Sequence, residues 1–184
     1  GLTKESAEEI PGWAFKQAAG RVFLKSYVNS MTEDGAERSA LEDSIVTIVD
    51  RYEAVAKELK QTNDPATAMA FSIAVLYSVA KESELDDEAF LALAGRVRKT
   101  LGEVKATDRQ KQEFYEWSLC SSGMVLAIAP TAKDEDGKKK LRTLAETQLA
   151  ILIGASVKQI KLKGEKVSIK AADLAAEGAV QGGT

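Results

Sequence analysis

The chain has 184 residues, of which 45% are hydrophobic and 29% are charged, and its formal net charge is −3. This length supports one substantial core, and no stretch approaches the roughly 18 uninterrupted apolar residues of a membrane span. The sequence contains no histidine. Histidine is the usual general base and the commonest transition-metal ligand, so Ser-His-Asp, Cys-His and histidine-metal chemistry are excluded.

The net charge conceals an uneven distribution along the chain. Residues 1–92 carry 9 basic and 17 acidic side chains, a net charge of −8, whereas residues 93–184 carry 16 and 11, a net charge of +5. Oppositely charged segments attract each other within one folded molecule, and they also favour head-to-tail contact between molecules. The sequence leaves both interpretations open.

Cys120 is the single cysteine, so no intrachain disulfide forms and cysteine usage assigns no redox compartment. It lies among apolar residues at helical spacing, which predicts a buried, inert thiol rather than a reactive one. Residues 1–9 are polar and acidic, and we expect neither a secretory signal nor a transit peptide within this chain. A signal removed before residue 1 is compatible with this pattern.

The first predicted element is an aromatic segment over residues 10–28. A Pro-Gly pair and Gly20 interrupt it, which indicates one broken helix or two short ones. A clearer helix follows over residues 41–59, because apolar side chains recur there at steps of three and four. Ser39 and Glu42 form a candidate capping box near its start.

The next two helices have stronger start signals. Asp64 followed by Pro65 predicts an N-cap with proline at the first helical position. Residues 66–80 are apolar on nearly every side, as expected of a central helix surrounded by others. Asp86 is then the predicted N-cap of a helix that continues to Gly102, with a hydrophobic staple around its start.

Two more helices complete the predicted bundle. Thr107 and a glutamine three residues later form a capping box for a helix that Pro130 ends. Residues 134–140 are predicted to be a polar connection. After it, an apolar stripe over residues 141–153 indicates a last helix, which Gly154 terminates.

The periodicity changes near the C-terminus. Residues 160–169 alternate apolar and polar side chains around Gly164, the pattern of a short β-hairpin. We expect a single helical domain over residues 1–177, with the hairpin at about residues 158–169 as part of it. Residues 178–184 are expected to form a frayed C-terminal tail.

The predicted hairpin is also the candidate surface for an anionic partner. Five lysines surround a single acid there, which is the pattern of contact with a membrane surface, a polysaccharide or nucleic acid. No arginine or aromatic side chain is interleaved with them, so base stacking is not expected, and lysines also protect exposed sheet edges. The candidate residues are Lys158, Lys161, Lys163, Lys166 and Lys170.

Three groups of carboxylates could in principle carry chemistry. Residues 86–88 are all acidic, but their place at a helix start predicts capping. Residues 134–137 resemble part of a calcium-binding loop, but the positions of their carboxylates relative to the glycine do not match those of such a loop. We therefore expect a solvated turn there. Glu113 and Glu116 lie one turn apart, as in carboxylate-bridged metal bundles, but the required histidine partner is missing, so we expect them on a surface face.

Four sequence blocks follow one another between residues 63 and 154. The blocks are Asn63-Asp64-x-Ala66-x-Ala68-x-Ala70-Phe71, Leu85-Asp86-Asp87-Glu88-Ala89-Phe90, Gln112-x-x-Tyr115-Glu116 with Gly123, and Leu144-Ala145-x-x-x-Leu149-x-x-Leu152-x-Gly154. In this order they resemble an uncharacterised family of secreted or periplasmic bacterial all-helical domains of unknown function. The resemblance covers about residues 60–170, and it implies a secreted or periplasmic location and a helical core but brings no activity.

We therefore predict an all-α bundle of about six or seven helices with a short C-terminal β-hairpin. The leading hypothesis is a non-enzymatic interaction or scaffolding protein of the bacterial cell envelope that self-associates. Its partner would be a protein or a second copy, with an anionic surface as a further option; nucleic acid, a membrane span, a cofactor and a metal are not expected. A carrier of an apolar ligand between helices and a carboxylate-dependent hydrolase remain as alternatives, so enzymatic activity stays open although the sequence favours its absence.

Overall fold

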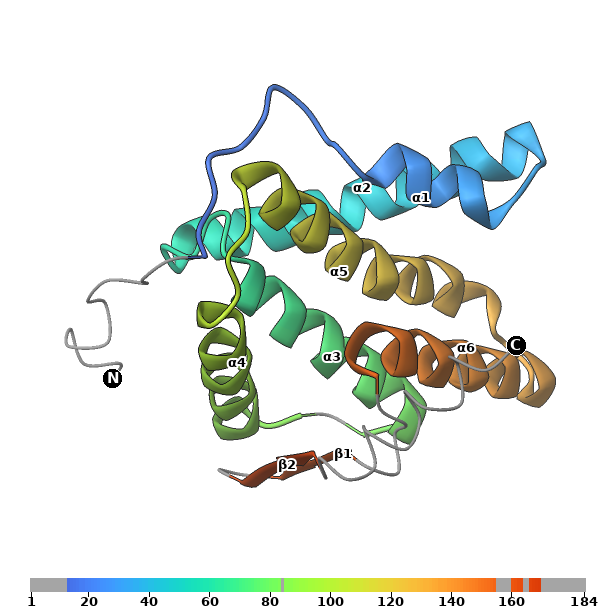
Figure 1. The fold of residues 1–184 in the computed structure, drawn as a ribbon. Helices are drawn as coiled ribbons and strands as arrows, with labels where there is room; N and C mark the ends of the chain where they lie inside the picture. The colour runs from blue at the N-terminus through green and yellow to red at the C-terminus, as the bar shows by residue number, and fades with distance from the viewer. Residues whose placement is uncertain (1–12, 84, 155–159, 164–165, 170–184) are drawn as a thin grey trace, which may run out of the picture.

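The computed structural model describes residues 13–83, 85–154, 160–163 and 166–169. These residues form a helical bundle, which confirms the predicted all-α class, and two short strands lie beside it (Figure 1). A 3-10 turn, η2 (Ala129–Thr131), follows the fifth helix. The α-helices are α1 (Leu24–Met31), α2 (Gly35–Glu58), α3 (Pro65–Lys81), α4 (Asp87–Gly102), α5 (Asp108–Ile128) and α6 (Glu135–Ile153).

Helix α3 is the centre of the bundle, as its apolar sequence predicts. It packs against α4, α5 and α6, and Figure 1 shows it between α4 and the α5–α6 pair. Ile73 and Leu76 of α3 are among its fully buried side chains. A second group of buried residues, which includes Ile45 and Leu119, lies between α1, α2 and α5. The two apolar clusters adjoin at Trp117 and together position every helix.

Three predicted helix starts and one helix end are confirmed. Asp64, Asp86 and Thr107 are the N-caps of α3, α4 and α5, and each side chain accepts a backbone N–H of the following turn. Thr107 and Gln110 make the complete capping box. Gly154 ends α6 with φ of 64°, a left-handed conformation that glycine adopts at low cost.

The prediction for the aromatic N-terminal segment is wrong in part. Residues 13–23 are not helical, and only α1 forms. The reason is tertiary, because side chains of α5 hydrogen bond to the backbone of this segment in place of helical partners. Trp13 and Phe15 are nevertheless buried. The segment therefore docks on the core as an extended arm.

Two further helix boundaries differ from the sequence predictions. Helix α2 begins at Gly35, before the expected capping box at Ser39, because Asp34 accepts the backbone N–H groups of Ala36 and Glu37. Helix α6 begins at Glu135, within the segment expected to be a polar connection, because Asp134 caps it. Acidic residues in a first turn, followed by lysines three and four positions later, stabilise such a start.

The strands β1 (Ile160–Lys163) and β2 (Lys166–Ile169) pair antiparallel, with Ile160 opposite Ile169, and lie beside α4. Residues 164–165, which hold the predicted glycine turn, lie outside the described residues, so the hairpin as a whole stays a prediction. The predicted tail over residues 178–184 also lies outside them.

Candidate functional site

The lysines of the predicted anionic-partner surface are only partly placed. Lys161 and Lys163 lie on β1, and Lys166 lies on β2 opposite Lys163. Lys158 and Lys170 lie outside the described residues. The anionic-partner surface therefore stays a prediction.

The acidic clusters at two helix starts have structural roles. The Asp86 carboxylate accepts the backbone N–H of Ala89 at 2.7 Å, which confirms the predicted cap. The Asp134 carboxylate accepts the N–H of Gly137 at 2.7 Å, so this cluster is a helix start rather than the expected solvated turn. Within residues 13–83, 85–154 and the two strands, no three Cys, Asp or Glu side chains gather as a metal site would require.

Glu116 is a buried carboxylate, and the expectation of a surface position for it is wrong. Its side chain is 2% exposed, and it accepts the backbone N–H groups of Val22, Phe23 and Leu24 at 2.7 to 3.2 Å. These N–H groups are the unpaired donors at the start of α1, where a negative charge is favourable. Gln112, one turn earlier on α5, donates to Glu116 and to the Gly20 carbonyl.

A second buried carboxylate belongs to Asp64. One oxygen caps α3, and the other accepts hydrogen bonds from Thr67 at 2.6 Å and from the Arg98 guanidinium at 2.8 Å. Arg98 comes from α4, so this ion pair fastens α4 to the start of α3. The Tyr52 hydroxyl is buried nearby, and burial with the adjacent Asp64 charge raises the pKa of Tyr52. Both buried carboxylates are therefore engaged in holding elements together.

Cys120 is buried within the cluster of α1, α2 and α5, as the sequence predicts. Burial, with the nearby Glu116 charge, raises the pKa of the Cys120 thiol to about 12. The nucleophilic thiolate is thus scarcely populated at neutral pH, and the side chain behaves as an apolar core residue.

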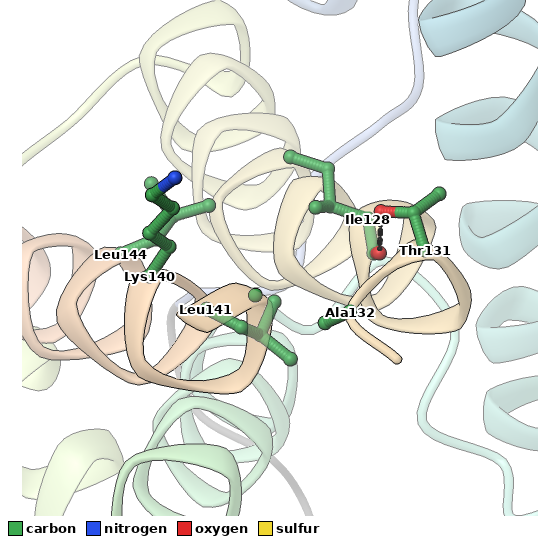
Figure 2. Close-up of a pocket in the computed structure, with 7 residues that line it drawn as sticks. Ile128, Thr131, Ala132, Lys140, Leu141 and Leu144 are labelled. Carbon is green, nitrogen blue, oxygen red and sulfur yellow. Dashed lines mark hydrogen bonds between the residues drawn. The ribbon is translucent and has the colours of Figure 1, made fainter. Parts of the chain in front are cut away.

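An open groove lies where α5, η2 and α6 meet, and periodicity gave no signal for it. Its volume is about 190 Å³ and its lining is mostly apolar. Figure 2 shows Ile128, Thr131 and Ala132 on one side and α6 side chains on the other. The Thr131 hydroxyl donates to the Ile128 carbonyl at 2.7 Å within the turn that forms this wall. The α6 side of the groove consists of Gly137, Lys140, Leu141 and Leu144.

Lys140 supplies the one ionisable group among the residues that line the groove. Its ammonium lies 2.6 Å from the Asp136 carboxylate, and both side chains are largely exposed. Such a surface pair contributes little stability. The groove thus combines an apolar floor with one ion-paired lysine at its rim.

A family model described as a family of unknown function (DUF6683) matches residues 3–170. The chain belongs to this family. The searches of curated proteins and of solved structures gave no match. The DUF6683 match includes the N-terminal third, which the sequence resemblance left out, and it spans the groove and the six α-helices that the structure describes.

Membership of DUF6683 adds no activity, substrate or location to these observations. Across the residues with a described placement, none of the helices combines the length and the apolar character needed to cross a bilayer. The function must therefore be argued from the groove and the surface around it.

Proposed function

We propose that this chain is a non-enzymatic interaction or scaffolding protein of the bacterial cell envelope and that the groove receives an apolar side chain of a protein partner. The volume of the groove carries the proposal, because about 190 Å³ suits one such side chain. A cavity of about 150 Å³ accommodates a benzene ring, whereas small-molecule sites typically enclose about 300–1,000 Å³.

The chemistry around the groove supports the same proposal. A single apolar anchor in a desolvated pocket, surrounded by a polar rim, is the arrangement that dominates many protein interfaces. Leu141 and Leu144 supply the apolar floor, and Thr131 and Lys140 supply the rim. A carboxylate-dependent hydrolase is less well supported, because the buried carboxylates of Glu116 and Asp64 already accept several hydrogen bonds.

The location in the envelope rests on the ordered sequence blocks that resemble secreted or periplasmic domains. Fractionation of the source cells tests this part separately. Recovery with the periplasmic or secreted fraction is the expected result, and recovery with the cytosol would contradict it while leaving the groove proposal intact.

A carrier of an apolar ligand is the second candidate, because the lining of the groove is mostly apolar. The small volume and open shape favour a side chain over a lipid, whose chain would remain largely in water. Native mass spectrometry of protein purified from its source distinguishes the two, because a carrier retains a lipid-sized mass. We expect masses that the polypeptide alone accounts for, in one or more copies, with no bound lipid.

Site-specific photocrosslinking in the source cells tests the interaction. A photoreactive phenylalanine replaces Thr131, which is exposed and lines the groove. We expect a protein adduct that the added substitution Ile128→Lys removes, because a lysine there places a charge in the apolar groove. The matched control is Ile151→Lys, since Ile151 is an exposed isoleucine of α6 outside the groove lining. An adduct that persists in both variants would exclude the groove as the contact.

A further inference from the structure

We infer that the partner of the groove is a second copy of this chain, which inserts Leu91 from the acidic start of its α4. This inference rests on the proposed function of the groove and names its occupant. Two independent observations lead to it, the exposure of Leu91 and the complementary charge of the two surfaces.

Leu91 is an apolar side chain that the fold leaves in water. It is 56% exposed, although its neighbours Leu93 and Ala94 on α4 are buried. It follows Asp87 by four residues and Glu88 by three, so the three side chains share one face of α4. Both acids are exposed. Leu91 is thus a single apolar projection flanked by two carboxylates.

The charges around the two surfaces are opposite. Residues 82–91 hold five acidic side chains and no basic one, whereas residues 133–142, which border the groove, hold five basic side chains and three acidic ones. Within one chain, Arg142 of α6 already pairs with Glu82 at 2.6 Å. The same chemistry between copies brings Asp87 or Glu88 to Lys140 when Leu91 occupies the groove.

The contact between copies would break only a weak surface ion pair. The Lys140–Asp136 pair is exposed, so exchanging Asp136 for a carboxylate of the second copy loses little stability. Because Leu91 and the groove are different surfaces, the contact either repeats head to tail or closes into a dimer that contains it twice. In both cases the association weakens as salt screens the charges.

Disulfide trapping tests the pairing directly. A Leu91→Cys protein is mixed with a Thr131→Cys protein under mild oxidation, and we expect the mixed disulfide to exceed both same-variant disulfides by about tenfold, because only paired residues reach disulfide geometry. The native Cys120 is buried and does not compete. The control mixture replaces the first protein by Ile151→Cys, whose position is 58% exposed. A mixed disulfide no more abundant than in the control would overturn the inference.

Sedimentation velocity gives a second test. We expect the unmodified chain to associate at about 0.05 M salt and to dissociate at about 0.5 M, as screening of charge pairs requires. Leu91→Ser should raise the dissociation constant about tenfold or more, as loss of an anchor does, whereas Ile151→Ser should leave it unchanged. A chain that is monomeric at low salt would overturn self-docking.

The two proposals fail in different ways. If the chain is monomeric but the Thr131 photocrosslinker captures a different protein, and Ile128→Lys prevents that capture, the groove still docks a partner and only the second copy is excluded. If neither association nor a groove-dependent adduct is found, both proposals fail.

Discussion

The Glu116 carboxylate accepts the backbone N–H of Phe23 at 2.7 Å, although the two residues are 93 positions apart in the sequence. The carboxylate belongs to α5, while the donor precedes the first residue of α1. A helix start normally takes its cap from its own first residues, and at this start no side chain of the capping residue does so. The position of α1 therefore depends on a side chain of another helix.

Replacing Glu116 by glutamine should destabilise the fold. The amide cannot offer two acceptor oxygens to three N–H groups, and its NH₂ would face some of those donors, so we expect a loss of about 1–3 kcal/mol in the free energy of unfolding. Urea denaturation measures it. The control is Glu113→Gln one turn earlier, where the exposed pair with Arg109 contributes less than about 0.5 kcal/mol. Equal losses would contradict the buried role of Glu116.

Two aspartate caps of different burial offer a second comparison. Asp64 is fully buried and also pairs with Arg98, whereas Asp34 is an exposed cap of α2. Asp34→Ala should cost about 1 kcal/mol, as loss of a cap alone does. Asp64→Ala should lower the free energy of unfolding by about 3 kcal/mol, because the variant loses the helix cap and also leaves Arg98 without its buried carboxylate partner. Thermal unfolding of both variants checks the order, and a larger loss for Asp34→Ala would refute it.

Local patterns were sufficient to predict part of this structure. The starts at Asp64, Asp86 and Thr107 were predictable because the capping side chain and the helix it begins are adjacent in the sequence. The burial of Glu116 was not, because its partners lie in a segment whose position depends on tertiary packing. The groove was also not predictable, since it forms only where the Ala129–Thr131 turn brings α6 back against α5.

Replacement by alanine should have opposite effects on stability at two helical glycines, because only Gly123 lies where two helices, α2 and α5, approach closely. A Cβ at Gly123 would lie 3.3 Å from Cγ2 of Ile45, which is fully buried and has little room to move. Gly123→Ala should therefore cost about 1 kcal/mol through overpacking. Gly95 in α4 has no described atom near its added Cβ, so Gly95→Ala should stabilise by up to about 1 kcal/mol. Chemical denaturation measures both, and a stabilising Gly123→Ala would show that the helices can separate.

The buried thiol of Cys120 predicts a loss of stability at alkaline pH. Its pKa is raised from 9.0 to about 12 by burial first and then by the Glu116 charge. Between about pH 9 and 12 the unfolded chain therefore releases this proton while the folded chain retains it, so the free energy of unfolding decreases as pH rises. Below pH 9 both states keep the proton, so the free energy of unfolding no longer changes with the titration of this group.

Comparison with Cys120→Ala isolates this contribution, because the buried tyrosines titrate in both proteins. The unmodified chain should lose up to about 1.4 kcal/mol per pH unit more than the variant within this window, the limit for one proton. Urea denaturation at several pH values provides the measurement. A thiol reagent at pH 8 should label Cys120 of the native chain only as fast as the fold opens to expose this side chain. If the free energies of unfolding of the unmodified chain and of Cys120→Ala changed equally with pH, and the native chain was labelled rapidly, Cys120 would be accessible to solvent.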